Sequence, residues 1–389
     1  MPNVEKNKFT PFAVLSVSFI LTSGVTINGT LPFIKDHFNL SQTQSELLGT
    51  LPSFTVVIFI LLSNYLTKKI GMKQVVIIGL IMASIGGVLP WLTPNSYGLI
   101  VFGRLLLGAG LGMYNALSVS FINGLFTGKE RSTLLGFRNA TESIGQMILT
   151  FVAGLLLMRN WMDSYLIYLL AIPIAILFYL YVPNIEAKAK VKTVDKGGSF
   201  SWVLLLTILI VASLLMNAIA IGVRFPTLAI ELAGQEVNAS AYLALMPILG
   251  IVAGILFEKI VSKVSFGIVF LGIGFNILSD FLIGFSTQSF WLLTIGLFLS
   301  SIPIAWVIPF IFNHIEELGR GIEPNKATSY VFVGCNFGVF LAPMCMNWAS
   351  KLLGSSDLRL PFIAFGIIFT IVLVILISIR KKIEQLLIK

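Results

Sequence analysis

Long apolar runs recur along the whole chain and are separated by short clusters of charged and turn-forming residues. Each run holds about 20 residues, which is enough for a helix to cross the hydrocarbon core of a bilayer. The pattern predicts twelve membrane-spanning helices. Their residue ranges are 12–34, 47–66, 74–92, 97–126, 133–158, 164–182, 202–225, 239–257, 266–285, 290–312, 327–349 and 361–379.

Composition leads to the same class of protein. Of the 389 residues, 57% are hydrophobic and 11% are charged, and the mean hydropathy is +0.95, far from the balance of soluble domains. Cys335 and Cys345 fall within one predicted span, so they indicate packing residues and neither a disulfide framework nor a metal site. We therefore predict an all-α polytopic membrane protein that holds no cofactor and no metal.

The basic residues are arranged as in a membrane protein. Of the 26 Lys and Arg, 20 lie in the two termini and in the regions that follow the even-numbered spans. Positive charge marks the cytoplasmic side, so both termini are expected in the cytoplasm. The net charge of +9 is spread over short loops, which argues against nucleic acid as a partner. The first apolar run lacks a cleavage site and is interpreted as a retained span.

The longest polar stretch, residues 183–201, divides the chain into an N-terminal half, 1–182, and a C-terminal half, 202–389. The stretch is basic and is expected to be a cytoplasmic linker. The two halves resemble each other, because Pro32 ends the first span as Pro226 ends the seventh. Such duplication is typical of secondary transporters, which build a site near the membrane midplane between their repeats.

Four motifs carry a resemblance to a known family. RLLLGAGLG, from Arg104 to Gly112, matches the Arg-x-x-x-Gly-x-Gly signature of helix 4 in the major facilitator superfamily, and ERSTLLGFRNATESIG matches the segment that leads into helix 5. NYLTKKIGMK resembles the family's cytoplasmic loop, and GILFEKIVSK is its counterpart in the second half. The resemblance implies two pseudo-symmetric six-helix bundles that transport a small molecule by alternating access. It implies a non-enzymatic protein, expected to be a monomer in the plasma membrane of a bacterial cell.

The chain also departs from the family pattern. Asn64 replaces the glycine of the cytoplasmic loop and Lys68 replaces its aspartate, whereas Glu258 supplies an acid in the second half. The Gly-Pro pair of the antiporter signature is missing, because Leu149 and Thr150 stand in its place. The resemblance implies that these loops gate the cytoplasmic side. The expected gating residues are Lys68, Lys69, Gly71, Glu258 and Lys259.

The fifth span carries charge where lipid cannot accommodate it. Arg138, Glu142 and Gln146 recur every four residues and form one polar stripe on a helix. Ionisable groups within a membrane usually mark a transport pathway, so we expect Glu142 and Arg138 to couple transport to protons. The alternative is an ion pair that only neutralises both charges. Arg104 is a further candidate for proton coupling or substrate contact, and the alternative for it is a structural arginine bound to carbonyl groups.

Polar residues in the other spans are candidates for substrate binding. The expected set is Asn28, Asn115, Asn139, Gln146, Asn217 and Trp306. Bonds between packed helices, or ordinary packing for the tryptophan, are the alternatives. Arg224 is interpreted as an interfacial arginine at the end of the seventh span. Asp280, with Asn276, is placed below Glu142 because the family resemblance puts its helix at the periphery.

The favoured function is secondary active transport of a small organic solute, coupled to protons. Efflux of amphipathic compounds fits the aromatic-rich chain, although the missing Gly-Pro pair argues against it. Uptake of a small anion is the alternative, based on Arg104, Arg138 and Arg224 and on LLGTLP in the second span, which resembles the cyanate permease group. A membrane enzyme would need a nucleophile with its base, and a receptor would more readily carry an added domain. Neither feature is found.

Overall fold

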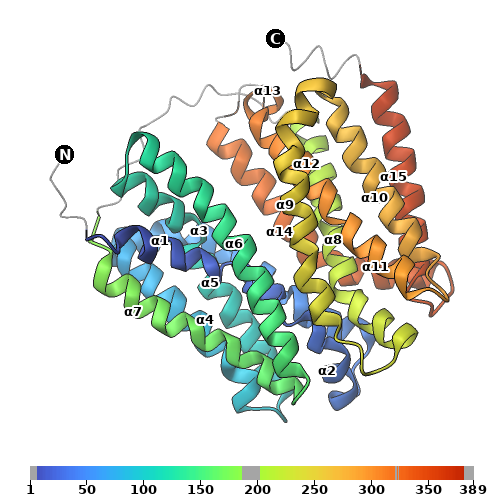
Figure 1. The fold of residues 1–389 in the computed structure, drawn as a ribbon, viewed down its shortest axis with the longest axis horizontal. Coiled ribbons are helices and arrows are strands. Elements are labelled where there is room, and N and C mark those ends of the chain that lie inside the picture. The colour runs from blue at the N-terminus through green and yellow to red at the C-terminus, as the bar shows by residue number, and fades with distance from the viewer. Residues whose placement is uncertain (1–6, 186–201, 320–321, 323, 381–389) are drawn as a thin grey trace. The chain divides into compact units, whose positions relative to one another are not determined.

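A computed structural model describes residues 7–185, 202–319, 322 and 324–380. Within these residues the chain is entirely helical, and twelve helical segments are long and apolar enough to cross a membrane (Figure 1). The prediction of an all-α chain with twelve spans is confirmed. Most of the predicted linker, residues 186–201, lies outside the described residues. So do residues 1–6 and 381–389 at the termini.

The chain divides by its internal contacts into two compact units, Met1–Ala189 and Lys190–Lys389. The first contains the helices α1 Thr10–Phe19, η1 Ser23–Val25, η2 Asn28–Thr30, α2 Leu31–Phe38, α3 Gln42–Ile70, α4 Met72–Leu92, α5 Tyr97–Leu125, α6 Gly128–Leu157, η3 Trp161–Leu170 and α7 Ala171–Tyr181. The second contains α8 Trp202–Ala233, α9 Ala239–Val264, α10 Gly267–Gly284, α11 Phe290–Leu299, α12 Ser301–Asn313, α13 Ile315–Gly319, α14 Pro324–Leu352 and α15 Leu360–Ser378.

The first span is not one continuous helix. Helix α1 ends at Phe19, and two short 3₁₀ turns, η1 and η2, follow before α2 begins. Pro32 stands in the first turn of α2, so the prediction that it ends the span is wrong. A proline at this position is favourable because its missing N–H would have no partner in the helix. The break leaves backbone carbonyls of this span free to accept bonds from other helices.

The seventh span is longer than predicted. Helix α8 runs through Pro226 and ends at Ala233, so this proline does not end it either. Prolines are tolerated inside transmembrane helices when neighbouring groups satisfy the freed backbone. Arg224 consequently lies inside the unit and only 1% of it is exposed. The interpretation of Arg224 as an interfacial side chain is wrong.

The glycines of α5 allow close packing on two sides. A Cβ atom added at Gly108 would overlap the backbone of Pro52 in α3, and one added at Gly110 would overlap the carbonyl oxygen of Gly79 in α4. Close helix approach is the usual purpose of small residues in membrane proteins. These glycines therefore hold α5, the helix that carries Arg104, closely against α3 and α4.

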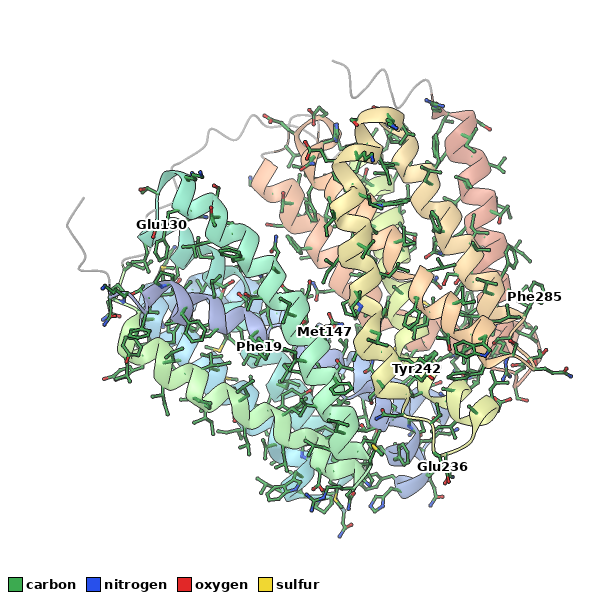
Figure 2. The ribbon with its side chains drawn as sticks, in the orientation of Figure 1. Phe19, Glu130, Met147, Glu236, Tyr242 and Phe285 are labelled. Atoms are coloured by element: carbon green, nitrogen blue, oxygen red, sulfur yellow. The ribbon has the colours of Figure 1, made fainter. Side chains whose placement is uncertain are left out.

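Large apolar side chains point outward from both units. Trp202, Ile255 and Trp291 are among the most exposed, and Figure 2 shows such side chains along the helices, with Phe285 labelled at the end of α10. Exposed apolar surface on this scale is expected where lipid covers the protein. Inside the second unit, Ile273 of α10 and Val307 of α12 are fully buried and belong to one apolar core.

Candidate functional site

The polar stripe of the fifth span forms an ion pair in the middle of α6. The Nη1 atom of Arg138 lies 2.9 Å from Oε2 of Glu142, which follows it by four residues. Glu142 lies about 21 Å along the helix axis from Gly128, at about 1.5 Å per residue. The two side chains are 14% and 24% exposed. The structure thus brings Arg138 and Glu142 together.

The ion pair contacts neighbouring polar groups of α5 and α6. Arg138 donates from Nη1 to Oδ1 of Asn139 at 2.9 Å and from Nε to the hydroxyl of Ser118 at 3.4 Å. Tyr114 of α5 is fully buried, and its hydroxyl has no hydrogen-bond partner among the described residues. Tyr114 lies within electrostatic range of Glu142. Sequence reasoning missed this tyrosine, although it shares the face of Ser118, four residues away in α5.

The remaining substrate candidates of the first unit differ in exposure. Asn115 and Gln146 are half-buried, whereas Asn139 is exposed. Asn28 begins η2 in the broken first span and is buried, and its Oδ1 has no hydrogen-bond partner among the described residues. A buried acceptor without a donor is costly, so it is a candidate for binding water or solute. Substrate binding by these four residues stays a prediction.

Arg104 joins three spans of the first unit. The side chain is 0% exposed, and Nε donates to the carbonyl of Leu48 in α3 at 2.7 Å. Nη2 donates to the carbonyl of Gly24 in the broken first span, and Nη1 donates to the hydroxyl of Tyr168 in η3 at 3.1 Å. That hydroxyl in turn donates to the carbonyl of Ser23 at 2.7 Å. These bonds favour the structural interpretation of Arg104, and its role in proton coupling stays a prediction.

The second unit buries a polar group that links α8 to α10. Nδ2 of Asn217 lies 2.7 Å from Oδ1 of Asp280 and 3.2 Å from Oδ1 of Asn276. Nδ2 of Asn276 donates to Oδ2 of Asp280 at 3.2 Å. All three residues are 0% exposed. The side chain of Asp280 points inward from α10 onto α8, so Asp280 is fully buried, although the resemblance was expected to place its helix at the periphery.

Trp306 is held by packing and by one hydrogen bond. The indole Nε1 donates to the carbonyl of Ala253 in α9 at 2.9 Å, and the ring lies edge-on to Phe275 at 5.5 Å between centroids. The span is interrupted at Ser300, between α11 and α12, about one helical turn before Pro303, whose missing N–H leaves the carbonyl of Leu299 without its helical donor. These contacts agree with the packing alternative, and a substrate role for Trp306 stays a prediction.

The expected gating residues lie at helix ends. Gly71 joins α3 to α4 with a φ of +86°, a backbone conformation that favours glycine. Lys68 and Lys69 precede it and are exposed, and Nζ of Lys69 lies 4.7 Å from the ring centroid of Tyr65. Glu258 and Lys259 are exposed near the end of α9. The gating role of all five stays a prediction.

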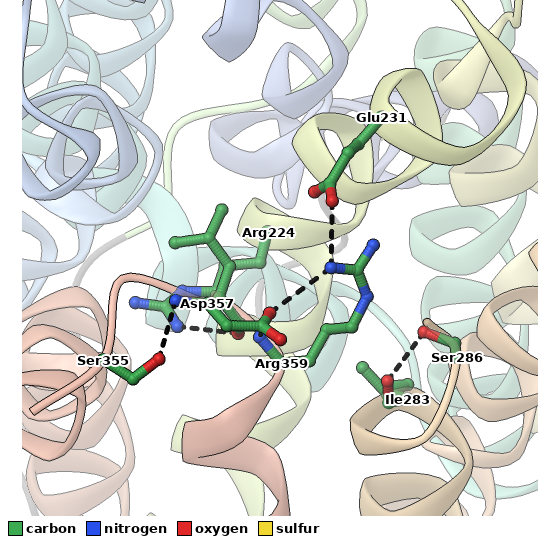
Figure 3. A network of polar contacts seen from close by, with 8 residues as sticks. Arg224, Glu231, Ile283, Ser286, Ser355, Asp357 and Arg359 are labelled. Carbon is green, nitrogen blue, oxygen red and sulfur yellow. Dashed lines mark hydrogen bonds and ion pairs between the residues drawn. The ribbon is translucent and has the colours of Figure 1, made fainter. Parts of the chain in front are cut away.

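A second network of charges, which sequence reasoning missed, ties α8 to the segment before α15 (Figure 3). Nη1 of Arg359 lies 3.0 Å from Oε1 of Glu231 and 3.3 Å from Oδ1 of Asp357. Arg224 donates from Nη1 to the carbonyl of Leu358 at 3.0 Å. This carbonyl contact explains why Arg224 is buried within the unit.

The described part of the chain contains no group of three or more His, Cys, Asp or Glu residues that could hold a metal ion. Cys335 is buried and Cys345 is half-buried, and both are free thiols. The polar clusters of the spans consist instead of carboxylate, amide, guanidinium and hydroxyl groups. Such groups can bind solutes by hydrogen bonds and can accept or release protons.

Parts of the chain are similar in sequence to known transport proteins. The chain is 26% identical over 156 residues to the bacillibactin exporter of Bacillus subtilis, a match that covers 38% of this chain and 39% of that protein. It is 26% identical over 133 residues to the galactose-proton symporter of Escherichia coli, covering 34% and 28% of the two chains. The chain thus matches well under half the length of these relatives.

Solved structures share the fold over nearly the whole chain. A peptide transporter crystallised with alafosfalin superposes with a TM-score of 0.77 at 14% identity, covering 97% of this chain and 95% of that one. The D-xylose-proton symporter superposes with a TM-score of 0.69 at 16% identity, covering 94% and 96%.

A sequence profile described as Major Facilitator Superfamily matches residues 13–279, more than half of the chain. The match includes Arg104, the stripe of α6 and both cytoplasmic loop motifs, so it covers the residues that carried the resemblance. It agrees with a non-enzymatic, multi-pass membrane protein. The chain belongs to the Major Facilitator Superfamily.

Proposed function

We propose that the chain is a secondary active transporter of a small organic solute, driven by protons that bind at Glu142. By alternating access it would open its solute site in turn to the two sides of the plasma membrane, with both termini in the cytoplasm. The observation that carries the proposal is the ion pair of Arg138 and Glu142 in the middle of α6. An ionisable pair at that depth is a candidate for the coupling site.

The surroundings of Glu142 suit a group that gains and loses a proton. Arg138 favours the charged carboxylate, whereas removal from water favours the neutral acid. A rearrangement that moves the guanidinium away from Glu142 would therefore favour the protonated carboxyl group. The buried hydroxyl of Tyr114 is within electrostatic range of the carboxylate and would sense the change. A galactose-proton symporter among the relatives supports protons as the coupling ion.

Efflux of amphipathic compounds is the direction we favour, supported by the similarity to a bacillibactin exporter. Uptake of a small anion is supported by three arginines within the spans, but the contacts of these arginines weaken this alternative. Arg104 and Arg224 donate to backbone carbonyls, and Arg138 is paired with Glu142. A guanidinium that is already engaged has fewer donors left for an anion.

Proteoliposomes that contain a pH-sensitive dye test the proposal. Either an outward-directed solute gradient or an imposed pH gradient is applied across the membrane. The coupled movement of protons and solute is then measured for each member of a panel of amphipathic dyes and small organic anions. We expect Glu142→Gln to abolish gradient-driven flux, because the amide cannot carry the proton. The matched control is Glu130→Gln, an exposed acid in the first turn of the same helix, labelled in Figure 2.

Two results would remove Glu142 from this role. One is gradient-driven flux of wild-type size in Glu142→Gln, and the other is an equal loss in Glu130→Gln, which would show a general effect of charge on α6. Competition between anions and lipophilic cations for the purified protein separates the two substrate classes. If lipophilic cations displace a bound amphipathic dye and anions do not, the result favours efflux of amphipathic compounds.

A further inference from the structure

We propose that Asp280 is a second proton-binding site, built inside the C-terminal unit, and that Asn217 responds to its protonation. The inference rests on the proposed function, since it assigns another proton to the same transporter. It is carried by the group of Asn217, Asn276 and Asp280, whose hydrogen bonds join α8 to α10. Both helices are labelled in Figure 1. The proton is exchanged with water, and the only bond that forms or breaks is the O–H bond of the carboxyl group.

Asp280 is isolated from compensating charge. It is 0% exposed, and among the described residues its polar contacts are to the amides of Asn217 and Asn276. A Cβ atom added at Gly366 in α15 would lie 3.3 Å from the Cβ atom of Asp280, so α15 packs directly against this residue. Burying a carboxylate without a cation is very costly, and such groups take up a proton or a cation instead.

In the described part of the chain, no charged group of the neighbouring helices forms an ion pair with Asp280. Helices α11 and α12 carry no charged residue, and α15 carries none between its ends. The charged and titratable groups on or beside the helices packed against α10 in the described part of the chain are Arg224, Glu231, Glu236, Tyr242, Glu258, Lys259, Lys263, His314, Asp357, Arg359 and Arg380. Arg224 is two helical turns beyond Asn217 and is bound to the carbonyl of Leu358.

A count of donors and acceptors identifies where the proton would be accommodated. Nδ2 of Asn217 uses its two hydrogens on Asn276 and Asp280, while Oδ1 of Asn217 is buried without any donor among the described residues. This pattern suits an ionised Asp280, which accepts from both amides. A protonated Asp280 carries one O–H donor and needs one acceptor.

Rotation of the Asn217 amide supplies that acceptor. A turn of 180° exchanges Oδ1 and Nδ2, which places the oxygen where the nitrogen now lies, 2.7 Å from Oδ1 of Asp280. That distance is ordinary for an O–H···O bond. The same rotation gives up the bond from Asn217 to Oδ1 of Asn276, which lies 3.2 Å from the exchanged position and would then face an oxygen, so the side chain of Asn276 must move as well. With that movement, the three side chains offer one hydrogen-bond pattern to the anion and another to the acid. Because Asn217 lies in the middle of α8, the change would be passed to a second helix of the unit.

Infrared difference spectroscopy tests the site without any substrate. The purified protein is titrated with acid and base, and the C=O stretch of buried carboxylic acids is followed. Growth with ¹³C-labelled aspartate shifts the bands of all aspartic acids, of which Asp280 is the buried one among the described residues, and leaves that of Glu142 in place. We expect a labelled, pH-dependent band in the wild type, its loss in Asp280→Asn, and its persistence in Glu142→Gln. In Asn217→Leu the band should shift in frequency, because the O–H group loses its acceptor.

Three outcomes would overturn the inference: no aspartate-derived band at any pH, a band that never responds to pH, or a band that sodium chloride removes at constant pH. The isotope shift separates aspartic from glutamic acids, and Asp280 is the one buried aspartate among the described residues, so the band of a buried aspartic acid is assigned to it even where Asp280→Asn does not fold. The proposed function is tested separately, because loss of coupling at Glu142 is measured by flux and does not depend on this band.

Discussion

Arg138 precedes Glu142 by one helical turn, and their charged atoms lie 2.9 Å apart. In isolated helices a pair in this order, with the cation first, is less stabilising than the reverse order, and either contributes only about 0.2–0.5 kcal/mol. The gain is small beside the cost of placing two charges in the middle of a membrane helix. Helix stability therefore does not explain the pair, which strengthens the argument for a role in transport.

A double-mutant cycle measures how strongly the two residues are coupled. We expect Arg138→Gln to destabilise the protein most, because it leaves Glu142 without its cation, and the double variant Arg138→Gln with Glu142→Gln to recover about 1 kcal/mol or more. Thermal unfolding followed by circular dichroism gives the comparison. Strict additivity of the two single changes would show that the ion pair has no energetic role.

Gly145 marks the closest approach of α6 to the first span. A Cβ atom added there would overlap the carbonyl oxygen of Phe19, which Figure 2 labels at the end of α1. Backbone cannot move aside as a flexible side chain can, so Gly145→Ala should cost about 2 kcal/mol or more. Gly136→Ala, on the same helix with open space around it, should be neutral or stabilising by up to about 1 kcal/mol. Equal melting temperatures for the two variants would contradict the packing.

Arg104 uses the planar fork of its guanidinium to reach three spans. Lysine keeps the charge but has one ammonium group, so Arg104→Lys leaves buried carbonyls such as those of Leu48 and Gly24 unsatisfied. We expect a loss of about 2–4 kcal/mol, at about 1–3 kcal/mol for each unsatisfied group. Arg159→Lys is the control, because Arg159 is exposed. Wild-type stability of Arg104→Lys would show that the charge alone is sufficient.

The ion pair of Glu231 and Arg359 should contribute little. The carboxylate side chain is 54% exposed, so water and salt screen its attraction for the guanidinium. Glu231→Gln is expected to change the free energy of unfolding by less than about 1 kcal/mol. Measurements at low and at high ionic strength should agree closely. A large effect that disappears in salt would mean that the carboxylate is more shielded than its exposure indicates.

Some errors of the sequence analysis came from reading helix ends from single prolines. Pro32 and Pro226 were both expected to end spans, but the first begins α2 and the second lies inside α8. A proline removes one donor and fixes one dihedral angle, and whether a helix stops there depends on whether neighbouring groups satisfy the freed carbonyl. That information belongs to the packed unit. The wrong placement of Arg224 followed from the expectation that the seventh span ends at Pro226.

The sequence by itself determined the class, the twelve spans and the family, because hydrophobic length and signature motifs are local properties of the chain. It also placed Arg138 and Glu142 on one face, since four residues make one helical turn. Tertiary structure alone decided which polar groups meet. Asn217 and Asp280 are 63 residues apart along the chain yet hydrogen-bonded, and Arg104 reaches the carbonyl of Gly24, which the broken first span exposes. A buried polar group must find a partner, but helix packing chooses which one.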